Sequence, residues 1–200
     1  MKTLVGSLLA CLLFTVAVSC AQDEEHATLS TEPLTAEQIA IYRVVLSTYR
    51  KGSKAPLNVS NKTEPLQPSQ GCTSRVKFDS TGGALIHRID GSTTLGSAIV
   101  LVDPDRQQEA IDQNDPQNLI KKAVDDHEKV TDKELNDTVK RAFESGVFAM
   151  SEIVFDKEHR FAIVAYSFVC GGLCGNGSTL VLRKTGQKWR VIRRCGGWIS

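Results

Sequence analysis

The pattern of apolar residues is clearest in the last fifty residues of the chain, 151–200. Residues 160–170 are apolar at both odd and even positions, which is typical of a strand buried on both faces. Shorter apolar runs at 152–155, 178–184 and 188–194 are separated from it by polar or glycine-containing turns. Four consecutive strands with short connections predict an antiparallel meander.

Three earlier segments carry apolar residues at helical spacing: 36–51, 116–124 and a segment that ends at Gly146. Each begins with a sequence signal that satisfies the free backbone N–H groups of a helix N-terminus. These signals are the capping boxes Thr35-x-x-Gln38 and Thr131-x-x-Glu134 and the pair Asp115-Pro116. Gly52 follows the first segment and is expected to stop it.

The region between the first and second helices is harder to interpret. Residues 57–59 and 76–78 are candidates for short strands. The apolar runs at 84–89 and 97–102 fit strands or short helices, because periodicity does not distinguish the two in runs of this length. Asp103-Pro104-Asp105 is expected to end the last run.

Helices early in the chain and strands late in it predict an α+β fold. We expect the N-terminal and central helices to pack on a C-terminal antiparallel β-meander. A chain of 200 residues fits one domain once a leader is removed, and we place that domain at 35–200.

Residues 1–19 have the pattern of a secretory signal peptide: a basic start, an apolar core at 4–18 and small residues at the end. The apolar core is too short for a comfortable membrane span. The leader also resembles a bacterial lipoprotein signal in which Cys20 is lipidated, although Ala17 stands where leucine is usual. Plain secretion is the alternative. Residues 20–34 are polar and acidic and are expected to form a tether.

Four cysteines follow the leader: Cys72, Cys170, Cys174 and Cys195. Exported proteins usually pair their thiols, and four cysteines allow three pairings. We favour Cys170 with Cys174 and Cys72 with Cys195, because the near pair can meet within one turn. A zinc site made by Cys170, Cys174 and Cys195 is a competing interpretation, disfavoured because no histidine lies near them in sequence.

The connection between the second and third strands of the meander is rich in glycine. Its residues are Gly171, Gly172, Leu173, Gly175, Asn176 and Gly177, interrupted by Cys174. Glycines at this density indicate a backbone that visits positive φ. A disulfide within the connection would make it a rigid binding loop or a redox pair, or simply a stapled hairpin corner.

The C-terminal quarter also resembles a group of uncharacterised secreted bacterial proteins. The resemblance rests on Phe155-Asp156, on Phe161-Ala162-Ile163-Val164, on the C-G-G-L-C-G element at 170–175, on Gly186-x-Lys188-Trp189 and on Trp198-Ile199-Ser200. It implies export and supplies no activity and no catalytic residues.

Charge is distributed unevenly, although the formal net charge is only +1. Residues 103–137 are mainly acidic, whereas no acid follows Glu158. The bases of the last hairpin are Arg183, Lys184, Lys188, Arg190, Arg193 and Arg194. They could bind an anionic cell-envelope component, a polymer or a lipid headgroup. We favour the alternative that the acidic helices lie across these strands. Nucleic acid is not an expected partner, because aromatic residues do not interleave with the bases.

No motif for a nucleophilic serine, a zinc protease, a P-loop or a dinucleotide site is present, so we expect no catalytic, metal or cofactor-binding residues. The leading hypothesis is an exported, cell-envelope-associated, non-enzymatic domain that presents the glycine- and cysteine-rich loop for interaction. The alternative is a thiol-dependent enzyme, hydrolytic or redox, that uses Cys170 and Cys174. Each of His87, His127 and His159 could then assist a cysteine nucleophile.

Overall fold

The computed structural model describes residues 28–66, 72, 77–78, 83–91 and 95–200. The predicted signal peptide at 1–19, the lipidation candidate Cys20 and residue 76 of a candidate strand therefore lie outside the described residues. The helices are α1 (Ala36–Arg50), α2 (Pro104–Gln113), α3 (Pro116–Asp125) and α4 (Asp132–Ser145). The strands are β1 (Thr28–Leu29), β2 (Leu57–Ser60), β3 (Leu85–Ile86), β4 (Ile99–Val102), β5 (Val147–Met150), β6 (Val154–Phe155), β7 (Phe161–Val169), β8 (Gly175–Thr185) and β9 (Lys188–Ile199).

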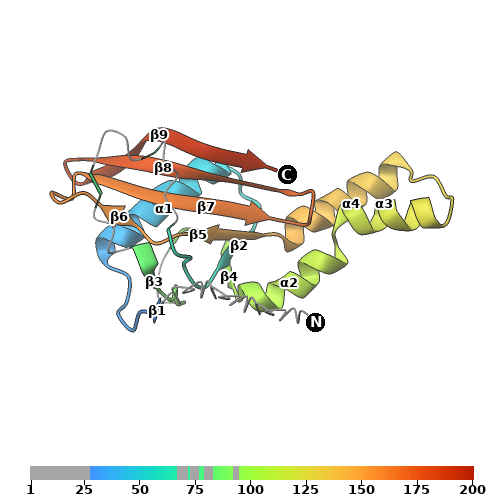
Figure 1. Ribbon diagram of the computed structural model, residues 1–200, viewed down its shortest axis with the longest axis horizontal. Coiled ribbons are helices and arrows are strands. Elements are labelled where there is room, and N and C mark those ends of the chain that lie inside the picture. The colour runs from blue at the N-terminus through green and yellow to red at the C-terminus, as the bar shows by residue number, and fades with distance from the viewer. Residues whose placement is uncertain (1–27, 67–71, 73–76, 79–82, 92–94) are drawn as a thin grey trace, which may run out of the picture.

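The fold is α+β, as the order of the elements predicts (Figure 1). The main sheet has the strand order β4-β2-β5-β7-β8-β9, and β6 pairs with β7. The strands β6 to β9 form the predicted antiparallel meander. The sheet as a whole is mixed, because β2 runs parallel to both β4 and β5. β1 and β3 form a separate parallel pair.

Helix α1 lies across one face of the sheet (Figure 1). It begins at the predicted capping box, where the Thr35 hydroxyl accepts the Gln38 N–H and the Gln38 side chain accepts the Thr35 N–H. Its apolar stripe is buried and consists of Ile41, Tyr42, Val45 and Leu46. The stripe joins one core with residues of the central strands, including Phe148, Val164 and Leu182.

The opposite face of the sheet carries a second, smaller apolar cluster. Ile163 of β7 packs there with Leu66, Cys72 and Val154, whereas the neighbouring Val164 faces the α1 core. Strand β7 is therefore buried on both faces, in agreement with its sequence.

Two elements differ from the sequence-based expectation. Asp103-Pro104 begins α2 rather than only ending a strand, because the Asp103 carboxylate accepts the N–H groups of Asp105 and Arg106 and Pro104 occupies the first turn. Residues 147–150 form β5, whose four residues are all buried, directly after α4. This run is too short for its period to identify a strand.

Residues 28–34, which we expected in a tether, take part in the fold. β1 pairs with β3, and Leu34 is 8% exposed in the α1 core. Among the described residues, no helix is both long enough and apolar enough to span a membrane.

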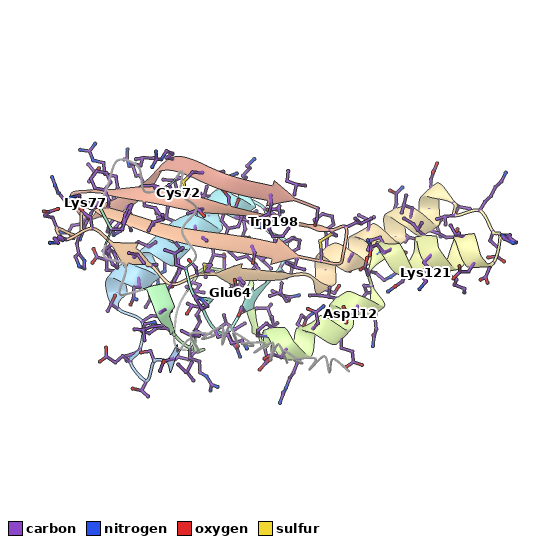
Figure 2. All side chains as sticks on the ribbon, viewed as in Figure 1. Glu64, Cys72, Lys77, Asp112, Lys121 and Trp198 are labelled. Carbon is purple, nitrogen blue, oxygen red and sulfur yellow. A yellow bond between two sulfur atoms is a disulfide. The ribbon has the colours of Figure 1, made fainter. Side chains whose placement is uncertain are left out.

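The acidic helices do not lie across the basic strands, so that interpretation is wrong. α3 and α4 project beyond one end of the sheet, and Asp112 and Lys121 lie on the helices to its side (Figures 1 and 2). In the described part of the chain, no ion pair joins α2, α3 or α4 to β8 or β9, and Lys184 of β8 instead pairs with Glu37 of α1 at 2.6 Å.

Candidate functional site

An apolar groove lies where the ends of β7, β8 and β9 meet α3 and α4. Its volume is about 910 Å³. Five large apolar side chains in its walls remain substantially exposed: Ile120, Phe143, Leu173, Trp198 and Ile199, at 46, 55, 63, 45 and 89%. Exposed apolar side chains gathered in one concave patch are typical of a binding surface.

The helical wall of the groove is anchored on the sheet through α4. Ala142 is fully buried in the core, and the Phe143 ring stacks on Phe168 of β7 with centroids 5.8 Å apart. Ile120 of α3 lines the same wall. None of the residues of α3 is buried in the core. The apolar face of α3 instead contributes Ile120 to the groove.

The opposite wall contains the predicted loop. The structure joins Cys170 to Cys174, with Cα atoms 5.0 Å apart, which is the pairing the sequence favours. Two backbone hydrogen bonds close the turn, from Cys170 N–H to the Cys174 carbonyl at 2.7 Å and from Cys174 N–H to the Gly171 carbonyl at 3.3 Å. Leu173 stands at the tip of this constrained turn.

Asp115 holds the loop against the start of α3. One carboxylate oxygen caps the helix by accepting the Gln117 N–H at 2.9 Å, and the other accepts the Gly172 N–H at 2.7 Å. Gly171 has a φ of +138°, and a Cβ at this position would lie 2.8 Å from the Asp115 carboxyl group. A larger residue at 171 would therefore push the loop away from the helix.

Trp198 of β9 covers the loop glycines on the third side of the groove. A Cβ at Gly175 would lie 3.0 Å from Trp198 Cζ3, and a Cβ at Gly177 would meet the indole ring at still closer range. The indole ring of Trp198 can lie against these two residues because neither has a Cβ. Ser200 N–H donates to the Gly175 carbonyl at 3.0 Å and holds the end of β9 there.

Arg194 supplies positive charge to the groove. Its guanidinium carbon lies 5.9 Å from the centre of the Tyr166 ring, and both residues line the groove. No ion pair among the described residues includes Arg194. Of the other predicted bases, Lys184 pairs with Glu37 and Arg193 donates to the Cys72 carbonyl. The predicted cationic surface is thus divided, and only Arg194 of that set lines the groove.

The geometry does not favour thiol chemistry. Both loop cysteines are in a disulfide, and Cys195 is bonded to Cys72, with Cα atoms 5.7 Å apart. Cys170, Cys174 and Cys195 are therefore not arranged as a common set of zinc ligands. The Asp115 carboxylate beside the loop would also disfavour a thiolate.

None of the three histidines within the described residues is bonded to a cysteine. The hydrogen-bonding partner of His87 is Glu152, and that of His159 is Glu37. His127 follows α3 and is exposed.

Sequence reasoning identified the loop but missed the other two walls. Phe143 and Ile120 follow the helical period of the predicted segments, and that period does not indicate a groove. An apolar stripe on a helix does not reveal whether its own domain covers it. The fold and the groove together define an α+β domain with an apolar groove that is lined in part by a disulfide-closed loop. A scan against protein-family models and searches of curated proteins and solved structures each find no match to this chain.

Proposed function

We propose that the protein is an exported, cell-envelope-associated domain that binds a long-chain carboxylate in the groove beside the Cys170–Cys174 loop. The observation that supports this function is the group of five exposed apolar side chains around a hollow of about 910 Å³. A site of this size matches the range of about 300–1,000 Å³ that is usual for small-molecule sites.

The apolar side chains in the walls of the groove indicate that the ligand has an apolar part. Ile120 and Phe143 come from the helices, whereas Leu173 and Trp198 come from the loop and β9. Burying this surface against a hydrocarbon chain would contribute about 25 cal/mol per Å² of apolar area removed from water. An acyl chain can follow an open groove, because it bends at each methylene.

The position of Arg194 indicates that the ligand also carries an anionic group. Its guanidinium faces the groove beside Tyr166 and belongs to no ion pair of the described residues. A planar guanidinium binds a carboxylate through two parallel hydrogen bonds. The same contact would not form with a neutral chain, so the site should discriminate between an acid and an alcohol of equal length.

Export is supported by the leader at 1–19 and, weakly, by the two disulfides. The protein would reside in the periplasm or on the outer surface. Lipidation at Cys20 would anchor it to a membrane, and without lipidation it would be secreted.

Tryptophan fluorescence provides the direct test. Trp198 lies in the groove, whereas Trp189 is 6% exposed in the core. Titration with dodecanoate is expected to change the emission of the wild type, and Trp198→Phe should abolish most of that change. Dodecanol should bind more weakly. Arg194→Gln is expected to reduce dodecanoate affinity about tenfold or more and to leave dodecanol affinity nearly unchanged.

Phe143→Ser should weaken both ligands. Ile192→Ser is the matched control, because Ile192 is an apolar residue of β9, 53% exposed, that does not line the groove. Absence of dodecanoate binding by the wild type, or equal losses at positions 143 and 192, would reject the proposal.

A separate experiment tests whether the Cys170–Cys174 loop contributes to binding. A Cys170→Ser, Cys174→Ser double variant should bind dodecanoate more weakly, because Leu173 is no longer held in one conformation. Equal binding by the variant and the wild type would remove the rigid loop from the function.

A further inference from the structure

One polar side chain that lines the groove, that of Ser178 in β8, is buried without a hydrogen-bonding partner among the described residues. In that part of the chain, only two buried side-chain nitrogen or oxygen atoms have no partner, Arg50 Nε and Ser178 Oγ. Arg50 still donates through its other two guanidinium nitrogens, to the carbonyls of Ser97 at 2.7 Å and Ala55 at 2.8 Å. Ser178 has a single hydroxyl, and the residue is only 6% exposed.

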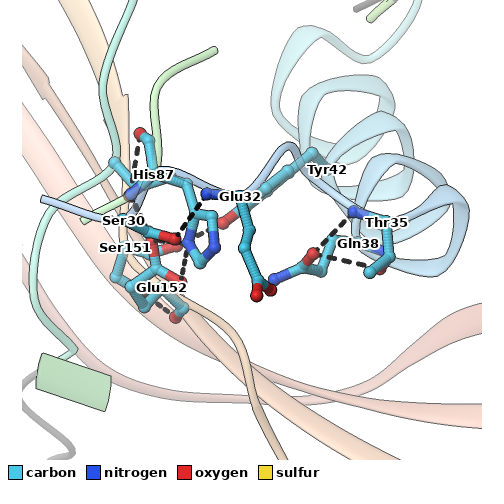
Figure 3. Close-up of polar contacts among 9 residues, drawn as sticks. Ser30, Glu32, Thr35, Gln38, Tyr42, His87, Ser151 and Glu152 are labelled. Atoms are coloured by element: carbon cyan, nitrogen blue, oxygen red, sulfur yellow. Dashed lines mark hydrogen bonds and ion pairs between the residues drawn. The ribbon is translucent and has the colours of Figure 1, made fainter. Parts of the chain in front are cut away.

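A cluster around Glu152 shows how buried polar groups of this fold are normally satisfied (Figure 3). Both carboxylate oxygens of Glu152 lie 2.9 Å from His87 Nδ1, and the Tyr42 hydroxyl donates to the Ser151 carbonyl at 3.0 Å. An unpaired buried hydroxyl destabilises a fold, so its occurrence needs an explanation. Because the hydroxyl of Ser178 belongs to a groove, we infer that a ligand supplies its partner.

The strand register places Ser178 close to Arg194 on one face of the sheet. Ser178 is opposite Tyr166 of β7, and Arg194 is opposite Leu180, two residues along β8 from Ser178. Directly opposite residues, and residues two apart on one strand, point to the same face. The guanidinium of Arg194 extends to the Tyr166 ring, so the positive charge and the hydroxyl occupy the same part of the groove.

Ser178 also lies on the path from Arg194 to the apolar walls. Along β8, it comes between Leu180, which is opposite Arg194, and the Cys170–Cys174 loop. A ligand whose carboxylate is bound by Arg194 and whose hydrocarbon chain reaches Leu173 therefore passes Ser178 near its carboxyl end.

The neighbours of Ser178 leave its hydroxyl for a ligand. Gly197 is opposite Ser178 on β9, and a Cβ there would lie 3.9 Å from Ser178 Oγ, so no side chain projects from β9 at that point. Asn176 is the next polar side chain toward the loop on the same face, and it already forms a hydrogen bond with the Tyr49 hydroxyl.

We propose that the ligand of the groove is a long-chain carboxylate with a hydroxyl group on its second or third carbon, and that Ser178 selects it. This inference rests on the function proposed above and names the class of acid. The guanidinium of Arg194 can bind both carboxylate oxygens, which leaves Ser178 for a different group. A ligand hydroxyl both donates and accepts, as the Ser178 hydroxyl does. An acid that lacks this hydroxyl leaves Ser178 unpaired and should bind more weakly.

Titrations followed by tryptophan fluorescence test the choice of ligand. The wild type should bind 2-hydroxydodecanoate or 3-hydroxydodecanoate about tenfold more tightly than dodecanoate. The control ligand is 12-hydroxydodecanoate, whose hydroxyl is at the far end of the chain and which should bind no more tightly than dodecanoate. If neither the 2-hydroxy nor the 3-hydroxy acid binds more tightly than dodecanoate, this inference is overturned while the proposed function stands. If none of these acids binds, both are rejected.

Ser178→Ala should abolish the preference, because it lowers affinity for the preferred hydroxy acid about tenfold and leaves dodecanoate affinity nearly unchanged. Thr179→Val is the matched control. Thr179 is the next residue of β8, is also 6% exposed and points to the other face, so this variant should keep the preference. A preference that persists in Ser178→Ala would contradict the assignment.

The stability of ligand-free Ser178→Ala separates recognition from a structural role. Removal of an unpaired buried hydroxyl should not lower the urea concentration at the midpoint of unfolding. Near-UV circular dichroism and the dodecanoate titration would show that the fold and the groove are intact. A midpoint below that of the wild type would mean that the hydroxyl already has a partner in the empty protein, which would also overturn the inference.

Discussion

The carboxylate of Asp115 accepts the backbone N–H of Gly172 at 2.7 Å, across 57 residues of sequence. Asp115 is at the same time the N-cap of α3. One side chain thus joins the helical wall of the groove to its loop wall, so the width of the groove depends on this contact.

Asp115→Ala should therefore remove two interactions, the helix cap and the bond to the loop. We expect the free energy of unfolding to fall by about 2 kcal/mol, measured by urea denaturation. Asp103→Ala is the matched control, because Asp103 only caps α2. Its loss should reduce the free energy of unfolding by about 1 kcal/mol. Equal losses in the two variants would show that the bond to Gly172 contributes nothing to stability.

Gly177→Ala should displace Trp198, because the added methyl group would overlap the indole. We expect a loss of about 1–3 kcal/mol, a red shift of tryptophan emission and weaker dodecanoate binding. Gly91→Ala is the control, since a Cβ there meets no atom within 4 Å. Unchanged emission in Gly177→Ala would mean that Trp198 does not depend on this glycine.

The two disulfides should stabilise the protein unequally. Cys72 and Cys195 are 123 residues apart, whereas Cys170 and Cys174 are 4 apart. Loop-closure entropy assigns about 5 kcal/mol to the long loop and about 2 kcal/mol to the short one. A Cys72→Ala, Cys195→Ala variant should therefore unfold at a lower urea concentration than a Cys170→Ala, Cys174→Ala variant. The reverse order would contradict this account.

Glu37 should give the protein an acid-sensitive contact. Burial alone would raise its pKa, but hydrogen bonds and charge from Lys184 and His159 outweigh burial and lower the pKa below the usual 4.5. The contact therefore stabilises the fold above the unfolded pKa and is lost as pH falls through the folded pKa.

Glu37→Gln should reduce the free energy of unfolding by less than about 1 kcal/mol at pH 7, because the contact is partly exposed. The difference from the wild type should disappear at an acidic pH below the folded pKa of Glu37, where the carboxyl group is protonated in both the folded and the unfolded state. Urea denaturation at both pH values measures it, and Glu158→Gln on the neighbouring turn controls for the loss of one charge. A difference that persists at the lower pH would contradict the assignment.

Local signals in the chain predicted a large part of the fold. The capping box at Thr35 set the start of α1, and the apolar residues at both odd and even positions of 160–170 indicated a strand buried on both faces. The same kind of signal is present at Asp103-Pro104, where we expected only the end of the apolar run at 97–102. The acidic composition of 103–137 led to a wrong expectation of where its helices lie, because charge on a helix surface does not specify a packing partner.

What the sequence by itself determined is the set of interactions between residues close together in the chain: helix caps, strand periodicity and a turn that two near cysteines can bridge. These depend on backbone geometry within a few residues. The tertiary structure alone decided that Trp198 covers Gly177, that Arg194 faces a groove and that Glu152 meets His87. Such contacts depend on strand register and on the packing of distant segments, for which a single chain carries no local signal.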